Sequence, residues 1–91
     1  MEKYIAIGFN ITHLTPSDKQ VLQTLADDPN VNRVMDRDSG FILKLCAEQP
    51  SFADGMSDSF ESLISIARMH FANQVEFDVN IEQTEGLDTF E

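Results

Sequence analysis

Two stretches of apolar alternation, one near each end of the chain, constrain the fold most. An apolar side chain recurs at every second position over residues 3–11 and again over residues 75–82. This period of two is typical of β-strands with one buried and one solvated face. The sequence therefore predicts a half-buried strand near each end. The apolar positions are Ile5, Ile7, Phe9 and Ile11 in the first strand and Val75, Phe77, Val79 and Ile81 in the second.

Two helices between these strands are indicated by their start signals. Residues 15–18 supply an N-cap hydroxyl from Thr15, a proline at the first helical position and an acid at the third, which predicts a helix to about Ala26. Residues 58–61 resemble a capping box that opens a second helix. Apolar residues then recur at helical spacing. This stripe comprises Phe60, Leu63, Ile64, Ala67 and Phe71.

The remaining elements complete a β-α-β-β-α-β order. Residues 31–36 and 41–46 are predicted strands, and the turn at residues 38–40 predicts that they form a hairpin. Residues 47–57 are a predicted loop. We expect an α+β fold with a ferredoxin-like antiparallel sheet and two helices on one face, since 91 residues suffice for one domain only. The predicted domain spans residues 1–82, and an acidic C-terminal tail spans residues 83–91.

Negative charge is concentrated in the C-terminal half. The chain carries 16 acidic and 6 basic residues, a net charge of −10. Residues 1–45 contain six acids and five bases, whereas residues 46–91 contain ten acids and only Arg68. Binding to nucleic acid or to an anionic membrane requires cationic side chains, so neither is expected. A basic protein surface, by contrast, would be attracted.

The densest acidic residues follow the last predicted strand into the tail. Three explanations for them remain open: a solvated strand face that aids solubility, a strip that binds a partner, or a catalytic pair of carboxylates. A second acidic group lies at the start of the second helix, where the helix dipole alone can account for it. The predicted partner-binding residues are Glu76, Asp78, Glu82, Glu85, Asp88 and Glu91, together with Asp54, Asp58 and Glu61.

Residues suited to catalysis or metal binding form no recognisable motif. Cys46, His13 and His70 are far apart in sequence and have no third ligand at metal-binding spacing. Cys46 is expected to be a buried strand thiol. Residues 36–40 have the wrong glycine spacing for a calcium loop, which favours a hairpin turn. We therefore expect no enzymatic activity, no metal and no cofactor.

Five short stretches carry a family resemblance. They are THLT at residues 12–15, SGFIL at 39–43, LISIAR at 63–68, VEFDV at 75–79 and LDTFE at 87–91. With them the chain resembles an uncharacterised family of small domains encoded on plasmids, phages and integrated mobile elements, often near antirestriction genes. The resemblance implies this genomic context. Small acidic proteins from it resemble inhibitors that occupy the nucleic-acid-binding surface of a defence complex, as anti-CRISPR and antirestriction proteins do.

Charge and resemblance together predict a non-catalytic, DNA-mimic-like accessory protein from a phage or mobile element. It would bind and inhibit a host nucleic-acid-binding defence nuclease or complex through its acidic surface. The N-terminus lacks a basic signal-peptide segment and no long apolar run is present, so the bacterial host cytoplasm is the expected location. The alternative is a self-associating structural or regulatory homodimer whose acidity confers only solubility. Its interface would be the sheet face with Tyr4, Ala6 and Gly8 beside Ile42.

Overall fold

Four strands form one mixed sheet in the computed structural model, which describes residues 1–45 and 52–90. Across the sheet the order is β1-β4-β3-β2, with β1 parallel to β4 and the other neighbours antiparallel. The predicted hairpin is confirmed, because β2 pairs with β3 around the turn that precedes Gly40. The strands are β1 (Ala6–Asn10), β2 (Val34–Arg37), β3 (Gly40–Lys44) and β4 (Gln74–Asp78).

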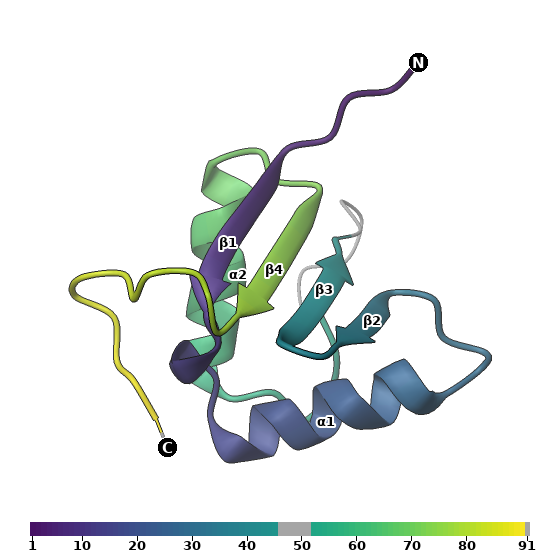
Figure 1. Ribbon diagram of the computed structural model, residues 1–91, viewed down its shortest axis with the longest axis horizontal. Coiled ribbons are helices and arrows are strands. Elements are labelled where there is room, and N and C mark those ends of the chain that lie inside the picture. The colour runs from purple at the N-terminus through teal and green to yellow at the C-terminus, as the bar shows by residue number, and fades with distance from the viewer. Residues whose placement is uncertain (46–51, 91) are drawn as a thin grey trace.

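The expected ferredoxin-like antiparallel order is wrong, although the α+β class is confirmed. In that order β4 would lie outside β1 and run antiparallel to it. Here β4 lies between β1 and β3 and runs parallel to β1. Residues 52–57, which include the buried Phe52, run toward the end of the sheet at which β3 begins, and the second helix starts there (Figure 1). As a result, β4 runs in the direction opposite to that of the last strand in the ferredoxin-like order.

The core lies on one face of the sheet. A row of buried side chains crosses the sheet through Val34, Leu43 and Val75, and a second row contains the rings of Phe41, Phe77 and Phe9. The rings of Phe9 and Phe77 stack with centroids 5.8 Å apart. Val75 and Phe77 are fully buried, as expected for a strand that lies between β1 and β3 under α2.

The second helix, α2 (Asp58–Met69), covers this face behind β1 and β4 (Figure 1). The predicted stripe is buried at Phe60, Leu63, Ile64 and Ala67. Phe71, the fifth predicted member, is instead 80% exposed. The helix ends before it, and Phe71 adopts a left-handed conformation with φ of 61° that turns the chain toward β4.

The first helix, α1 (Pro16–Asp27), crosses one end of the sheet and contributes Leu22 to the same core (Figure 1). Its predicted start is confirmed, because Thr15 caps the helix and forms a capping box with Asp18. The first strand is shorter than predicted, since a short 3-10 helix, η1 (Ile11–His13), replaces its last position. No helix in the described ranges has the length and apolar character needed to span a bilayer.

Candidate functional site

The last strand ends at Asp78, four residues earlier than predicted, and this divides the predicted acidic strip. The Asp78 carboxylate accepts a hydrogen bond of 2.8 Å from the backbone N–H of Asn80, which closes an Asx turn. Asn10 then holds the turn by donating to the Ile81 carbonyl at 2.6 Å. Glu82 therefore does not continue the polar face of β4, and the predicted extension of this strand to residue 82 is wrong.

Glu76 and Asp78 lie on the open face of the sheet and already have partners there. Glu76 pairs with Arg37 at 3.6 Å, and Asp78 accepts the Ser39 hydroxyl at 2.7 Å. Hydrogen bonds from the Asn80 backbone and from Ser39 hold the pKa of Asp78 below its ordinary value. Both carboxylates therefore have a structural explanation in the hairpin and the turn that border them.

His13 anchors the chain that follows β4. Its side chain is buried, and its two ring nitrogens bond to the C-terminal segment, residues 82–90. Nε2 accepts the Thr84 backbone N–H at 2.9 Å, which leaves Nδ1 to donate to the Asp88 carbonyl at 2.8 Å. Phe90 adds a backbone hydrogen bond of 2.7 Å to Thr12. The neutral Nδ1–H tautomer of His13 thus fastens the C-terminal segment to η1.

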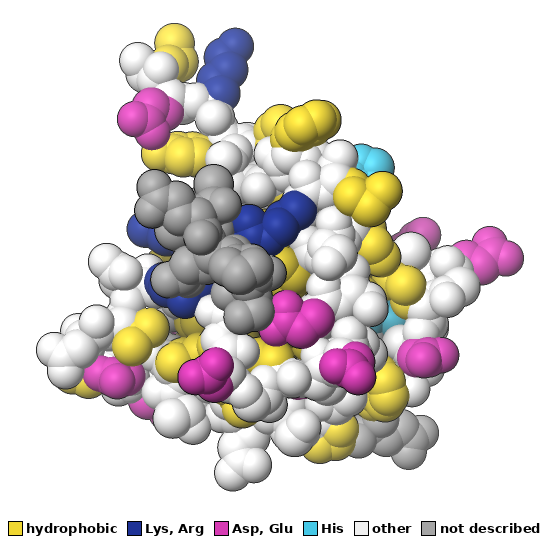
Figure 2. Space-filling view, turned by 180° about the vertical axis from the view of Figure 1, so that it is seen from behind, with side chains coloured by type: hydrophobic (Ala, Val, Ile, Leu, Met, Phe, Trp, Pro, Cys, Tyr) yellow, Lys and Arg dark blue, Asp and Glu magenta, His cyan; other side chains and the backbone are white. Residues whose placement is uncertain are grey.

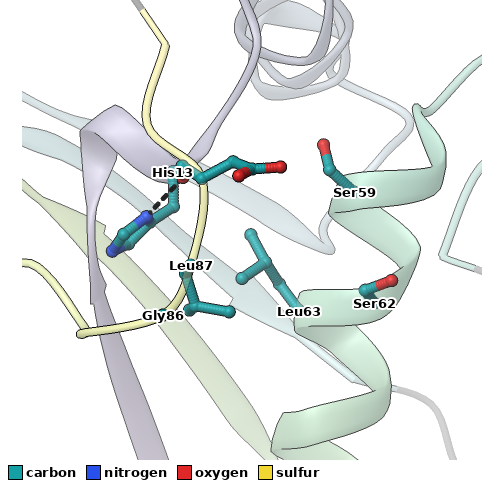
Figure 3. A pocket seen from close by; sticks show the side chains of 7 residues that line it. His13, Ser59, Ser62, Leu63, Gly86 and Leu87 are labelled. Carbon is teal, nitrogen blue, oxygen red and sulfur yellow. Dashed lines mark hydrogen bonds between the residues drawn. The ribbon is translucent and has the colours of Figure 1, made fainter.

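A hollow of about 200 Å³ lies between this segment and α2 (Figure 3). On one side Ser59, Ser62 and Leu63 project from α2, and on the other lie His13 and the segment itself. We call this hollow the C-terminal groove. Its floor is apolar and its borders are polar, an arrangement that suits an amphipathic side chain of a partner. The lining residues are His13, Ser59, Ser62, Leu63, Gly86, Leu87 and Asp88.

The groove brings together acidic residues from both predicted groups. Asp88 lines it, and Glu85 precedes the lining residue Gly86. On the other border, Asp58 directly precedes Ser59 in α2, whereas Glu61 projects from a different side of the helix than Ser59, Ser62 and Leu63. No Lys or Arg of the described ranges lines the groove. Figure 2 shows acidic side chains gathered in the lower half and along the right-hand border of the α2 side of the molecule.

A buried carboxylate holds the α2 border in place. Asp18, in the first turn of α1, accepts hydrogen bonds from both the N–H and the hydroxyl of Ser57, at 2.8 and 2.6 Å. Ser57 is in turn the N-cap of α2. Burial opposes ionisation of Asp18, but these bonds together with those from Thr15 lower its pKa below the ordinary value. One charge therefore fixes the N-termini of both helices.

Asp54 and Glu82, two more of the predicted residues, do not line the groove. Asp54 is exposed in the turn before α2, and Glu82 is exposed at the start of the C-terminal segment. Glu91 and Cys46 lie outside the described residues, as do residues 47–51 of the predicted loop. Across residues 1–45 and 52–90, no three His, Cys, Asp or Glu side chains are grouped so that they could hold a metal ion.

Comparison with protein families gives one match. The model described as "Family of unknown function (DUF5983) C-terminal domain" matches residues 8–91. The chain belongs to this family. Comparisons with curated proteins and with solved structures gave no match. The family match covers η1, α2 and the C-terminal segment, and so it includes the whole C-terminal groove.

The sequence did not predict the roles of Asp18 and His13, which hold the two borders of the groove in place. Asp18 was identified only as a favourable acid in the first turn of α1, because its bonds to Ser57 span 39 positions. His13 was considered only as a catalytic residue or metal ligand that lacks a motif, and its hydrogen-bond partners lie 71 and 75 positions away. The only sequence signal was chemical: an isolated histidine beside apolar neighbours, which is typical of a buried, hydrogen-bonded side chain.

Proposed function

We propose that this chain is a non-catalytic protein that binds a basic surface of a nucleic-acid-binding defence protein and inhibits it. The observation that carries the proposal is the C-terminal groove. Asp58, Glu85 and Asp88 are exposed in or next to it, and no basic residue of the described chain lines it. A partner that supplies Lys or Arg would therefore find exposed carboxylates in or next to the groove.

The overall charge of the chain also favours a basic partner. Residues 46–91 hold ten of the 16 acids and a single base. Such a field repels phosphate and attracts a cationic groove, and it raises the rate of association at low ionic strength. A surface that normally binds DNA or RNA has the required sign of charge. The resemblance to domains encoded near antirestriction genes supports a defence protein as the partner.

We propose fewer residues for the contact than the sequence analysis did. Glu76 and Asp78 are set aside, because the open face of the sheet supplies partners for both. Glu82 is exposed at the start of the segment and can extend the contact. The proposed contact therefore comprises Asp58, Glu82, Glu85 and Asp88, and Glu61 is also set aside because it projects from another side of α2.

The test is capture of partners from bacterial lysate by three tagged forms of the protein. Wild type should retain a basic nucleic-acid-binding protein that salt elutes and that added DNA displaces. The double variant Glu85→Lys with Asp88→Lys should retain much less of it. The matched control is Glu2→Lys with Asp38→Lys, which changes the net charge equally at exposed positions outside the groove. Equal loss in both variants would show that only net charge matters and would overturn the groove as the site.

Self-association through the open sheet face is the alternative function. Little of that face is open to a second copy, because Ile81 of the same chain lies against Gly8. A Cβ placed on Gly8 would lie 2.7 Å from Cδ1 of Ile81. Light scattering separates the two proposals: a dimer that persists in high salt, with no other partner captured, would favour self-association.

A further inference from the structure

The outer edge of β1 has no neighbouring strand. β1 lies at the end of the order β1-β4-β3-β2 and pairs on one side only. The Ile5 carbonyl accepts the Gln74 N–H, so the backbone groups of Ile5 and Ile7 face β4. The backbone groups of Ala6 and Gly8 therefore point away from the sheet. Within residues 1–45 and 52–90 no hydrogen bond engages them, and both residues are exposed. We call this the free edge of β1.

The opposite edge of the sheet is protected against pairing with another strand. Its strand, β2, has four residues, and Asp36 and Arg37 place charges on it. Asp36 also accepts a hydrogen bond of 3.1 Å from Gln23 of α1. Residues 4–12, by contrast, contain no charged residue and no proline. Charge and proline are two of the usual means by which proteins block an edge strand, and the free edge of β1 has neither.

Apolar side chains border the free edge on the side of α2. Ile7 lies on the same face of β1 as the buried Phe9, but it is only partly buried, and Ile5 is 48% exposed. Ile66 follows Ser59 by two helical turns, so it lies on the same side of α2 as the C-terminal groove, and it too is only partly buried. An extended segment laid along β1 would cover these side chains with every second residue of its own.

A second copy of the chain fits this edge poorly. Two copies joined by antiparallel pairing of β1 would have these strands about 4.8 Å apart and their helices on the same face of the joined sheet. Figure 1 shows α2 behind β1, with turns of the helix visible beyond the outer edge of the strand. The two α2 helices would then lie closer than the roughly 8–10 Å at which helices pack. Each copy also carries a net charge of −10, so the two would repel. A segment without a helix behind it meets neither obstacle.

We infer that the free edge of β1 binds an extended segment of a partner protein as an added strand of the sheet. Ala6 and Gly8 exchange backbone hydrogen bonds with it, as in other cases of strand addition. The side chains that the segment directs toward α2 are apolar. Those on the other face are polar or basic, because Glu82 is exposed and follows Ile81, which lies against Gly8. The site uses no carboxylate of the C-terminal groove, so it is independent of the proposed function.

Selection from a phage library of short random peptides tests this inference. Peptides retained by wild type should alternate apolar with polar or basic residues and contain few acids. Ala6→Pro removes an outward N–H and places a ring at the edge, so it should weaken their binding by about tenfold or more. Ala6→Ser keeps the backbone groups and should bind as wild type does.

Three further measurements separate strand pairing from other causes. Ala6→Pro should unfold at nearly the same urea concentration as wild type, whereas Ile7→Pro loses a hydrogen bond to β4 and should unfold earlier. In wild type, a bound peptide should slow hydrogen exchange at the amides of Ala6 and Gly8. Asp88→Lys should bind the selected peptides as wild type does, which separates this site from the proposed function.

Four results would overturn the inference. Two of them are unchanged exchange at Ala6 and Gly8 in the presence of peptide, and peptides that bind Ala6→Pro as tightly as wild type. The third is a set of selected peptides rich in Asp and Glu. The fourth is a wild-type dimer that Ala6→Pro abolishes, because the occupant of the edge would then be a second copy of the chain.

Discussion

At the residue scale, Asp18 has the largest structural consequence of any carboxylate described. It is fully buried, and it accepts hydrogen bonds from Ser57 and Thr15 at the start of both helices. An ionised carboxylate can be buried at tolerable cost only if its oxygens are satisfied in this way. Because α2 forms one border of the C-terminal groove, this single side chain also sets the position of that border.

Replacing Asp18 by Ala should destabilise the fold by about 3 kcal/mol, because buried donors on Ser57 and Thr15 would lose their acceptor. Urea unfolding measures this, with Asp38→Ala at an exposed position as the control. The pKa of Asp18 is lowered in the folded chain, so its contribution should be present above the unfolded pKa of about 3.9 and be lost as pH falls through the folded value. Equal acid sensitivity of wild type and Asp18→Asn would contradict this assignment.

At the scale of elements, the C-terminal segment depends on a contact distant in sequence. Between Gln83 and Phe90 it contains no helix or strand, and side chains of η1 hold it instead. His13 supplies a donor and an acceptor from one ring, while Leu87 packs against the core from the segment itself. One wall of the groove is therefore only as stable as the bonds to His13.

His13→Ala should release the segment before the rest of the molecule unfolds. The variant loses two hydrogen bonds and leaves a cavity, at a cost of about 2 kcal/mol. Hydrogen exchange should show faster exchange at Thr84 and Phe90, with the amides of β4 unchanged. His70→Ala, at an exposed position, is the matched control. Unaltered exchange at Thr84 in the His13 variant would show that His13 does not hold the segment.

The hairpin of β2 and β3 depends on the absence of a side chain at Gly40. A Cβ at this position would lie 1.7 Å from the backbone oxygen of Phe77, on the neighbouring strand β4. Backbone atoms cannot move aside as the end of a flexible side chain can. Gly40→Ala should therefore destabilise the protein by about 3 kcal/mol, measured by urea unfolding. A Cβ at Gly86 would meet no neighbouring atom, so only the positive φ opposes Gly86→Ala. This variant should therefore lose less stability than Gly40→Ala.

At the scale of the whole molecule, local patterns predicted the elements but not their arrangement. The N-cap at Thr15, the hairpin and most of the α2 stripe follow from contacts between near neighbours in sequence, and all were predicted. The capping box predicted at residues 58–61 was wrong, because Ser57 is the N-cap of α2 and Asp58 is its first residue. The place of β4 between β1 and β3 depends on pairing between residues distant in sequence, which no periodicity encodes. The same limit applies to the site: composition indicated an acidic surface, but the Asx turn at Asp78 decided which carboxylates remain available.

The acidity of the whole molecule can serve binding at one site or solubility. The C-terminal groove presents exposed carboxylates between α2 and the C-terminal segment. Exposed charges are screened beyond about 8 Å at physiological ionic strength, so only contacts made at the groove itself should depend strongly on its acids. Affinity measured against salt is thus the property that distinguishes a binding groove from acidity that serves solubility.

The most direct test is the dissociation constant of the captured basic partner, measured over a series of salt concentrations for wild type, Asp88→Lys and Asp38→Lys. We predict that wild-type binding weakens steeply as salt rises. Asp88→Lys should bind less tightly at low salt and depend less on salt, whereas Asp38→Lys should follow wild type closely. Binding that is insensitive to salt, or that falls equally in both variants, would contradict the assignment of the C-terminal groove as the binding site.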